Sequence, residues 1–497
     1  MSAYVLSLVA LVSLQALTSD SSRTLTSDSS RTLTSDSSRT LTSDSSRTLT
    51  FDDFYRAVAS NHPVVRQARL LEDIADAEVQ GARGGFDPSL SAGWNRKTFQ
   101  GTRYYDYVDA ALTIPTPLGV DVKVGYERTS GAFIAPDRRT PRGGLLMAGV
   151  VVPIGQRLIT DERRTALSQA RALREYARGE RAAVVNKLLL TAAKVYGQWY
   201  ESYRRRDLTI EALALADFRL RSVRSRVLNG DAAAIDTIEA QLEVQRRRVS
   251  QLEADVDLRN NSAVVAGFLW SASGGAVDLP PGTVPSLAGL ESARVDEERV
   301  VVWLATAERS HPNLRKAVAT IREAQAERLF VAQQLFLPDV EVSYGAIGGR
   351  TMGESGLGDS FGSATDAKWG GAAKIPLLFL KERGKYSATS AKLEQARFEL
   401  ALVRRDIGIA VRTAANDLAA LDSLLVLQRV TVTQARLLRD GEQRKFENGE
   451  STLFLVNARE RSALDEQVKL IALEAKYAGA RAALAVAIGE PARLPQR

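Results

Sequence analysis

The chain has 497 residues, of which 45% are hydrophobic and 25% charged, a composition typical of folded proteins and not of long disordered ones. It contains no cysteine, which excludes disulfides, thiolate metal sites, a cysteine nucleophile and a lipidated N-terminal cysteine. The formal charge is +7, but 66 basic residues are interleaved with 59 acidic ones, and the basic triplets at 204–206 and 246–248 fall within helical patterns. We therefore expect solvated helix faces and no binding of nucleic acid.

The first 48 residues differ in composition from the rest. Residues 1–16 include an apolar stretch that resembles the core of a secretory signal, although no Lys or Arg precedes it. No apolar stretch of the chain reaches the length of about 18 residues that a membrane-spanning helix needs. Residues 17–48 contain the octad Leu-Thr-Ser-Asp-Ser-Ser-Arg-Thr four times in succession. Such a polar repeat buries no core, so we predict a disordered spacer.

From Leu49 onward the same succession of patterns occurs twice, which predicts one structural repeat at 49–290, a second at 291–490, and a tail at 491–497. Asn61-His62-Pro63 and Ser310-His311-Pro312 each open a helical pattern, and the two patterns end near Gly84 and Leu335. Proline is favoured in the first turn of a helix, and a polar residue before it can cap the helix. We interpret both histidines as caps, not as metal ligands or catalytic groups.

Each helical pattern leads through a Phe and Pro turn into segments of alternating apolar and polar residues. This alternation is typical of strands in a membrane barrel, although soluble antiparallel sheets alternate too. Candidates for aromatic girdles at the membrane surfaces are Trp94, Tyr126, Tyr344 and Trp369. The first repeat has four strand-like segments, at 89–99, 105–114, 120–128 and 145–152. A Gly-rich stretch at 348–362 lacks the ending of a phosphate loop, so we expect a mobile external loop.

Each repeat continues with a very long helical pattern. Between 392 and 437 apolar residues recur at steps of three and four, as in the seam of a coiled coil. A helix from about Lys381 to Glu447 would be roughly 100 Å long at 1.5 Å per residue. A matching stretch runs from about Gln156 to Leu228. Both end at an Asn-Gly turn, and returning helices follow at 232–270 and 452–488, which predicts two antiparallel hairpins.

In this order of elements, residues 49–490 resemble the TolC-like outer membrane efflux family. The resemblance is carried by Leu49-Thr50-Phe51, the two His-Pro helix openings, the strand-closing Pro153 and Pro376, and the two Asn-Gly tips. It implies a mixed fold, in which a membrane β-barrel continues as a long α-helical coiled-coil barrel and the channel is a trimer. That family has two strands per repeat, so the extra segments between 105 and 128 would form an enlarged external hairpin or extend the strands.

The resemblance also implies a function and partners. The protein would be a passive exit duct of a tripartite efflux or type I secretion system, without cofactor or enzymatic activity. It would lie in the lipid of the outer membrane, with its helical tube in the periplasm. A periplasmic adaptor (membrane fusion) protein would link it to an inner membrane pump of the RND or ABC class. The tip residues Asn229, Gly230, Asn448 and Gly449 would contact the adaptor.

A candidate aperture follows from counting along the family pattern from the tip glycines. Asp236 matches a position that makes a polar contact between hairpins, whereas Phe446 stands in place of its usual tyrosine partner. The other candidates are Ser451 in place of an arginine, the apolar Leu455 and Ala458 in place of an acidic constriction, and the nearby Asn457 and Arg459. We therefore expect a gate closed by apolar packing at Phe446 and Leu455. The alternative makes Asp236 a solvated residue that is favoured at a helix start by the dipole.

Two other classes of function are weighed against the channel. A coiled-coil scaffold of the cell envelope without a pore accounts for the heptads but not for the alternating strands. An enzyme with a helical lid is disfavoured, because the sequence contains no nucleophile–base–acid set, no metal-ligand spacing and no nucleotide loop.

Overall fold

The computed structural model of the chain describes residues 48–157, 159–288, 295–349 and 366–490. The predicted signal segment, the octads up to residue 47, the Gly-rich stretch from residue 350 and the tail lie outside these ranges. Within the described ranges, no helix is both long enough and apolar enough to cross a membrane.

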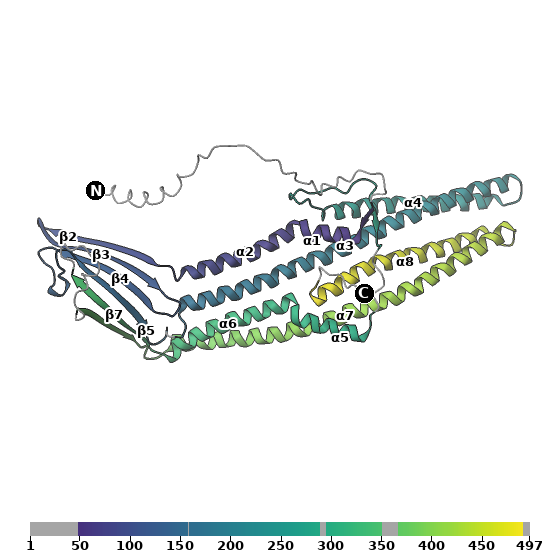
Figure 1. Cartoon of the computed structure of the whole chain (residues 1–497). Helices are drawn as coiled ribbons and strands as arrows, with labels where there is room; N and C mark the ends of the chain where they lie inside the picture. Colours follow the sequence, from purple (N-terminus) through teal and green to yellow (C-terminus); the bar gives the residue numbers. More distant parts are fainter. Residues whose placement is uncertain (1–47, 158, 289–294, 350–365, 491–497) are drawn as a thin grey trace, which may run out of the picture. The chain divides into compact units, whose positions relative to one another are not determined.

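Helices and strands follow one another in the same order in both halves of the chain (Figure 1). Short helices α1 (Phe51–Asn61) and α2 (Pro63–Gly84) precede the first strands, and α5 (Glu297–Ser310) and α6 (Pro312–Phe336) precede the second set. After the strands come the long helices α3 (Glu162–Leu228) and α7 (Leu380–Glu447), with the returning helices α4 (Ala234–Ala266) and α8 (Leu453–Ile488). Each long helix begins beside the sheet and ends at a hairpin turn.

The interpretation of both histidines as caps is confirmed. Nδ1 of His62 accepts a hydrogen bond from the Val64 amide at 3.2 Å, and Nδ1 of His311 accepts one from the Asn313 amide at 3.2 Å. Each histidine is the N-cap of a helix that has proline in its first turn. The imidazole therefore satisfies an amide that the helix leaves without a partner.

All four strand-like segments of the first repeat belong to one sheet. Its strands are β2 (Ser89–Phe99), β3 (Thr102–Pro115), β4 (Asp121–Ser130), β5 (Leu145–Pro153), β7 (Asp339–Gly349) and β8 (Ala367–Lys374). They are antiparallel neighbours in the order β2-β3-β4-β5-β7-β8. The external-hairpin alternative for 105–128 is thus wrong, because β3 and β4 lie between β2 and β5 and pair with both.

The pairing register gives this sheet one continuous apolar face. Paired residues of an antiparallel sheet share a face, and Trp94 pairs with Val108, Val124 with Ala148, and Tyr344 with both Val150 and Trp369. We call this the apolar face; its large members are Leu90, Trp94, Val108, Leu112, Ile114, Val122, Val124, Tyr126, Leu146, Val150, Val152, Val340, Val342, Tyr344 and Trp369. The four aromatic residues predicted as girdles all lie on it.

The first long helix begins six residues later than the predicted Gln156. The preceding segment is tied instead to the end of α6, because the Gln156 amide donates to Pro338 O at 2.9 Å and the Thr160 amide to Gln333 Oε1 at 3.1 Å. Asp161 then caps α3 by accepting from the Arg164 amide at 2.7 Å. The returning helix α4 likewise ends at Ala266 and not near Trp270, with Gly267 as its C-cap.

A buried cluster beside the middle of α3 joins the N-terminal strand to the segment that connects the two halves. Strand β1 (Thr48–Thr50) pairs in parallel with β6 (Val284–Ser286), which lies between α4 and α5 in the chain. The Tyr196 hydroxyl lies 2.6 Å from Leu49 O and 2.9 Å from Ser286 O, and it accepts from the Ser286 amide at 2.9 Å. The rings of Phe51, Phe54 and Trp199 surround it.

Candidate functional site

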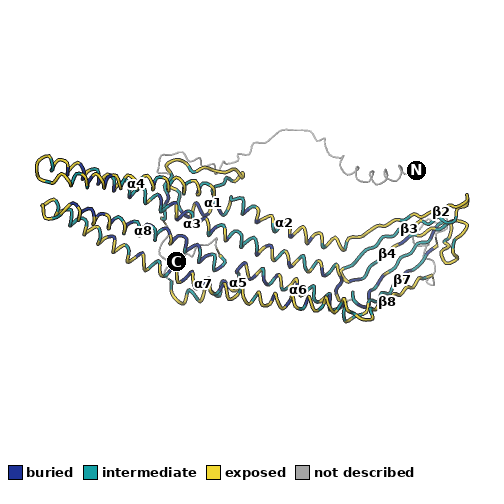
Figure 2. Tube along the Cα trace, turned by 180° about the vertical axis from the view of Figure 1, so that it is seen from behind, coloured by how far each residue is buried: buried dark blue, intermediate teal, exposed yellow. Residues whose placement is uncertain are grey.

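The two hairpin turns have the same backbone geometry. Gly230 has φ +80° and Gly449 has φ +78°, and a Cβ at either position would meet no neighbouring atom within 4 Å. The amide after each glycine bonds back into the helix, Asp231 to Arg226 O and Glu450 to Lys445 O, both at 2.8 Å. Glycine is required by the left-handed backbone alone. Asn229, Gly230, Asn448 and Gly449 are all exposed (Figure 2), and their contact with an adaptor stays a prediction.

Asp236 is the third residue of α4, where a negative charge is favoured by the helix dipole. Among the residues that the structure describes, its carboxylate has no hydrogen-bond or ion-pair partner. Within one chain it therefore does not join the two hairpins. Ser451 donates to Glu442 Oε1, within its own hairpin, and Leu455 and Arg459 are exposed.

Phe446 does join the two hairpins, in an apolar cluster below the turns. We call this the tip cluster; it contains Leu213, Ala216, Leu220, Val223 and Val227 of α3, Ala240 and Val244 of α4, Phe446 of α7 and Leu453 of α8. The Arg226 guanidinium lies 5.0 Å from the centre of the Phe446 ring, a favourable cation–π distance. Leu455, the other residue expected to close the gate, is 42% exposed and lies outside this cluster.

A buried polar group adjoins the tip cluster and crosses between the same hairpins. Arg219 of α3 makes an ion pair with Glu460 of α8, and the two side chains are 9% and 3% exposed. The same guanidinium donates to Asn457 Oδ1 at 3.1 Å and to Gln443 Oε1 at 3.4 Å. Asn457 in turn donates to Glu239 Oε1 at 3.3 Å. We call these five residues the polar seam, which links all four helices of the two hairpins.

Glu243 makes a second crossing one helical turn further along α4. Its buried carboxylate accepts from Arg461 Nη2 of α8 at 2.6 Å and lies 2.8 Å from Arg247 Nη2 of its own helix. Burial alone would raise the pKa of Glu243, but the hydrogen bond from Arg461 and the charges of Arg247 and Arg461 outweigh it, so the pKa lies below its usual value. Glu243 is therefore ionised at neutral pH and pairs with both hairpins.

Of the predicted aperture residues, the structure brings Phe446 and Asn457 into the contact between hairpins and leaves Asp236, Ser451, Leu455 and Arg459 outside it. Sequence reasoning missed Arg219, Glu243 and Glu460, because charges on a long helix usually face solvent. One signal was available. Arg219 stands between Ala216 and Leu220, on the buried face of α3.

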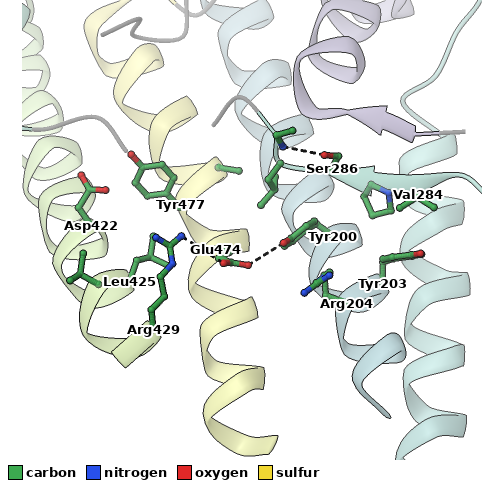
Figure 3. Close-up of a pocket in the computed structure, with 15 residues that line it drawn as sticks. Tyr200, Tyr203, Arg204, Val284, Ser286, Asp422, Leu425, Arg429, Glu474 and Tyr477 are labelled. Carbon is green, nitrogen blue, oxygen red and sulfur yellow. Dashed lines mark hydrogen bonds and ion pairs between the residues drawn. The ribbon is translucent and has the colours of Figure 1, made fainter. Parts of the chain in front are cut away.

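Further along the helices, a cavity of about 700 Å³ opens where the two halves meet. Figure 3 shows Tyr200 of α3 reaching Glu474 of α8, beside Arg429 of α7; Tyr203 and Arg204 of α3 also line the cavity. The Tyr200 hydroxyl donates to Glu474 Oε2 at 3.0 Å. Burial, together with the nearby Glu474 carboxylate, raises the pKa of Tyr200 to about 12. The phenol therefore stays protonated, and its hydrogen bond to Glu474 links the two halves of the chain.

Comparisons with known proteins agree with this architecture. A family model described as outer membrane efflux protein matches residues 303–490. Over 263 residues the chain is 27% identical to Protein CyaE of Bordetella pertussis, and the match spans about half of each protein, 52% of either length.

Solved channels share the fold. The CmeC outer membrane channel of Campylobacter jejuni gives a TM-score of 0.63 at 11% identity, over 88% of this chain and 85% of that one. The open state of the MtrE outer membrane channel of Neisseria gonorrhoeae gives 0.60 at 14% identity, over 94% and 98%. At these identities the likeness establishes the fold alone. The family match runs from within α5 to the end of α8, so the second half of the chain is similar to outer membrane efflux proteins, and the described chain shares the fold of these channels.

Proposed function

We propose that the chain is one subunit of a trimeric channel and serves as a passive exit duct of a tripartite efflux or type I secretion system, not as an enzyme. The match to the outer membrane efflux protein model and the channel fold support a place in the outer membrane, with the helices in the periplasm. The observation that carries the proposal is the sheet, which has one continuous apolar face and strands of suitable length. β4, β2 and β7 have 10, 11 and 11 residues, and a tilted strand of about 9–11 residues crosses the hydrocarbon layer.

The two ends of the sheet favour assembly with further copies. β2 and β8 are its outermost strands, and each pairs along one side only within the described residues. Unpaired strand edges are unfavourable in lipid, because no water is present to satisfy their amides and carbonyls. Pairing of β8 of one copy with β2 of the next satisfies both edges. Repetition around an axis closes a barrel with the apolar face outward.

The helices carry matching apolar stripes that a neighbouring copy would cover. On α4 exposed apolar side chains recur at steps of three, four and seven, at Ile235, Ile238, Leu242, Val249, Leu252 and Val256. On α7 the exposed residues include Leu402, Ile409, Leu424, Leu427 and Leu438. Such heptad spacing is that of a coiled-coil seam, and large exposed apolar stripes mark contact surfaces. Contact between α4 of one copy and α7 of the next is heterologous and generates a closed ring.

The hairpin ends are then the periplasmic entrance. The exposed turns at Asn229, Gly230, Asn448 and Gly449 suit contact with a periplasmic adaptor bound to an inner membrane pump of the RND or ABC class. Phe446 packs within the subunit, whereas the exposed Leu455 can contact Leu455 of the neighbouring copies. We therefore keep the proposal that apolar packing at these two positions closes the gate. Asp236, Ser451 and Arg459 are the polar candidates for contacts between subunits.

The test is the conductance of the purified protein in planar bilayers. We expect discrete channel openings, and larger or longer openings for Phe446→Ala and Leu455→Ala than for Asp236→Ala. A soluble protein that never conducts after correct export contradicts the duct and favours the scaffold of the cell envelope. Opening by Asp236→Ala alone contradicts apolar closure but leaves the duct intact.

A further inference from the structure

We propose that Arg103 and Arg128, at the outer end of the apolar face, bind the phosphate groups of a membrane lipid whose acyl chains lie against that face. The outer end is the end of the sheet away from the helices, and it holds the turn at 100–101 and the loop at 131–144. The inference rests on the proposed orientation of the apolar face toward lipid.

The charges of the apolar face gather in its last rows. Arg128 pairs with Val108, which pairs with Trp94, so this guanidinium shares a row with two large apolar side chains. In the next row Arg96 pairs with Asp106. The register then shifts between Lys97 and Thr98, and beyond this irregularity Arg103 pairs with Thr98. Toward the helices, the paired rows of this face on all six strands hold no charged residue.

The cations in these rows differ in how they are partnered. Arg96 is engaged, because Nη2 lies 2.7 Å from Asp106 Oδ2, and Trp94 Nε1 donates to Asp106 Oδ1 at 2.7 Å. Arg103 and Arg128 are both exposed, and among the described residues neither has a carboxylate within salt-bridge distance. One cation of three is thus neutralised and two guanidinium groups remain available.

The loop that follows β4 is held against these two residues. The Ala132 amide donates to Arg103 O at 3.0 Å and the Phe133 amide to Tyr104 O at 3.0 Å. Thr129 and Thr140 exchange hydrogen bonds between amide and hydroxyl at 2.9 and 3.1 Å. The loop carries the exposed Arg138, Arg139 and Arg142, which add positive charge at the same end of the sheet. A fixed backbone lowers the entropy lost when these cations bind an anion.

This arrangement matches a phosphorylated lipid better than free phosphate. Guanidinium groups bind phosphate through paired charge-assisted hydrogen bonds, which strengthen where water is scarce. Trp94, Val108 and Tyr126 lie in the same row as Arg128 or in the next row toward the helices, where acyl chains would lie. Inorganic phosphate would gain nothing from them. The opposite face mixes signs, with Lys97, Asp109, Lys123, Glu127 and Lys368, and offers no such pairing of cations with an apolar band.

The experiment titrates the full-length protein in detergent with lipid A that carries its phosphates and measures bound lipid by native mass spectrometry. The ligand control is the same lipid without phosphates. The variant is Arg103→Gln/Arg128→Gln, and the matched control is Lys123→Gln/Lys368→Gln, which removes the same charge from the opposite face of the same sheet. We expect the first variant to lose affinity by about tenfold or more, the equivalent of about 1.4 kcal/mol, and the control to bind like the wild type.

Equal binding by Arg103→Gln/Arg128→Gln and wild type overturns the inference, as does equal loss in the control. Equal binding of the dephosphorylated lipid, or full competition by inorganic phosphate at the same concentration, also overturns it. Conductance of both variants is recorded in parallel. Normal channels with lost lipid binding confirm the site, whereas absence of conductance in the wild type would refute the proposed duct on separate grounds.

Discussion

Replacing Arg219 with Ala removes the cation that faces Glu460 across the two hairpins. The Glu460 side chain is only 3% exposed, and Asn457 and Gln443 lose their donor at the same time. Breaking a buried ion pair from one side costs about 3–5 kcal/mol, because the remaining charge stays desolvated. The two hairpins can relieve this cost by moving apart and admitting water. We therefore expect the destabilisation to appear as separation of α3/α4 from α7/α8.

The absence of native cysteine provides a clean assay. Leu453→Cys places a single thiol in the tip cluster, at a position that is 3% exposed. Its rate of labelling by a thiol reagent reports how often the hairpins separate. At 1.4 kcal/mol per tenfold change, a cost of about 3 kcal/mol raises the labelling rate by about a hundredfold.

Two further variants make this prediction specific. Arg224→Ala, on the same helix, removes an exposed guanidinium that donates to Gln241 of its own hairpin at 3.3 Å, its one side-chain partner among the described residues. This change should alter labelling by less than about twofold. Adding Glu460→Gln to Arg219→Ala removes the unpaired buried carboxylate. The double variant should therefore recover much of the protection of the introduced thiol against labelling. If Arg219→Ala labels no faster than Arg224→Ala, the polar seam does not hold the two hairpins together.

Other predictions follow from single contacts. Burial and a nearby lysine lower the pKa of His311 to about 4. The contribution of His311 to stability is therefore full above its unfolded pKa of 6.5 and is lost progressively as the pH falls toward 4. His311→Asn keeps a capping acceptor and should remove this part of the pH dependence of Tm, which is worth up to about 3 kcal/mol. Tyr196→Phe leaves backbone groups of the β1–β6 pair without a partner and should cost about 1–3 kcal/mol, measured as a lower Tm. An unchanged Tm would show that water replaces the hydroxyl. Gly155→Ala should block correct folding, since a Cβ at this position would overlap Pro338 O. Gly230→Ala should cost only about 1 kcal/mol, seen as equal yields of folded protein for Gly230→Ala and wild type.

Local signals in the sequence were sufficient for most of the secondary structure. The helix predicted from Lys381 to Glu447 spans Leu380–Glu447, because a proline-free heptad pattern between a strand and an Asn-Gly turn has few alternatives. The capping histidines were likewise predictable, since the cap acts on an amide two residues away. The alternation of the strands also determined their faces, once each strand was known to belong to the sheet.

Tertiary packing determined the neighbours of each strand and the pairing of buried charges, which the periodicity of the sequence does not specify. From the sequence, residues 105–128 were either an external hairpin or an extension of the strands, because alternation does not specify which strands pair; the structure places β3 and β4 within the sheet. Arg219 and Arg224 look alike in sequence, five residues apart on one helix. One is buried against Glu460 and the other is exposed, since only the approach of α8 distinguishes their faces. Composition and period determine the elements and their apolar sides, whereas the pairing of buried charges depends on which sides meet, and that is a property of the packed chain.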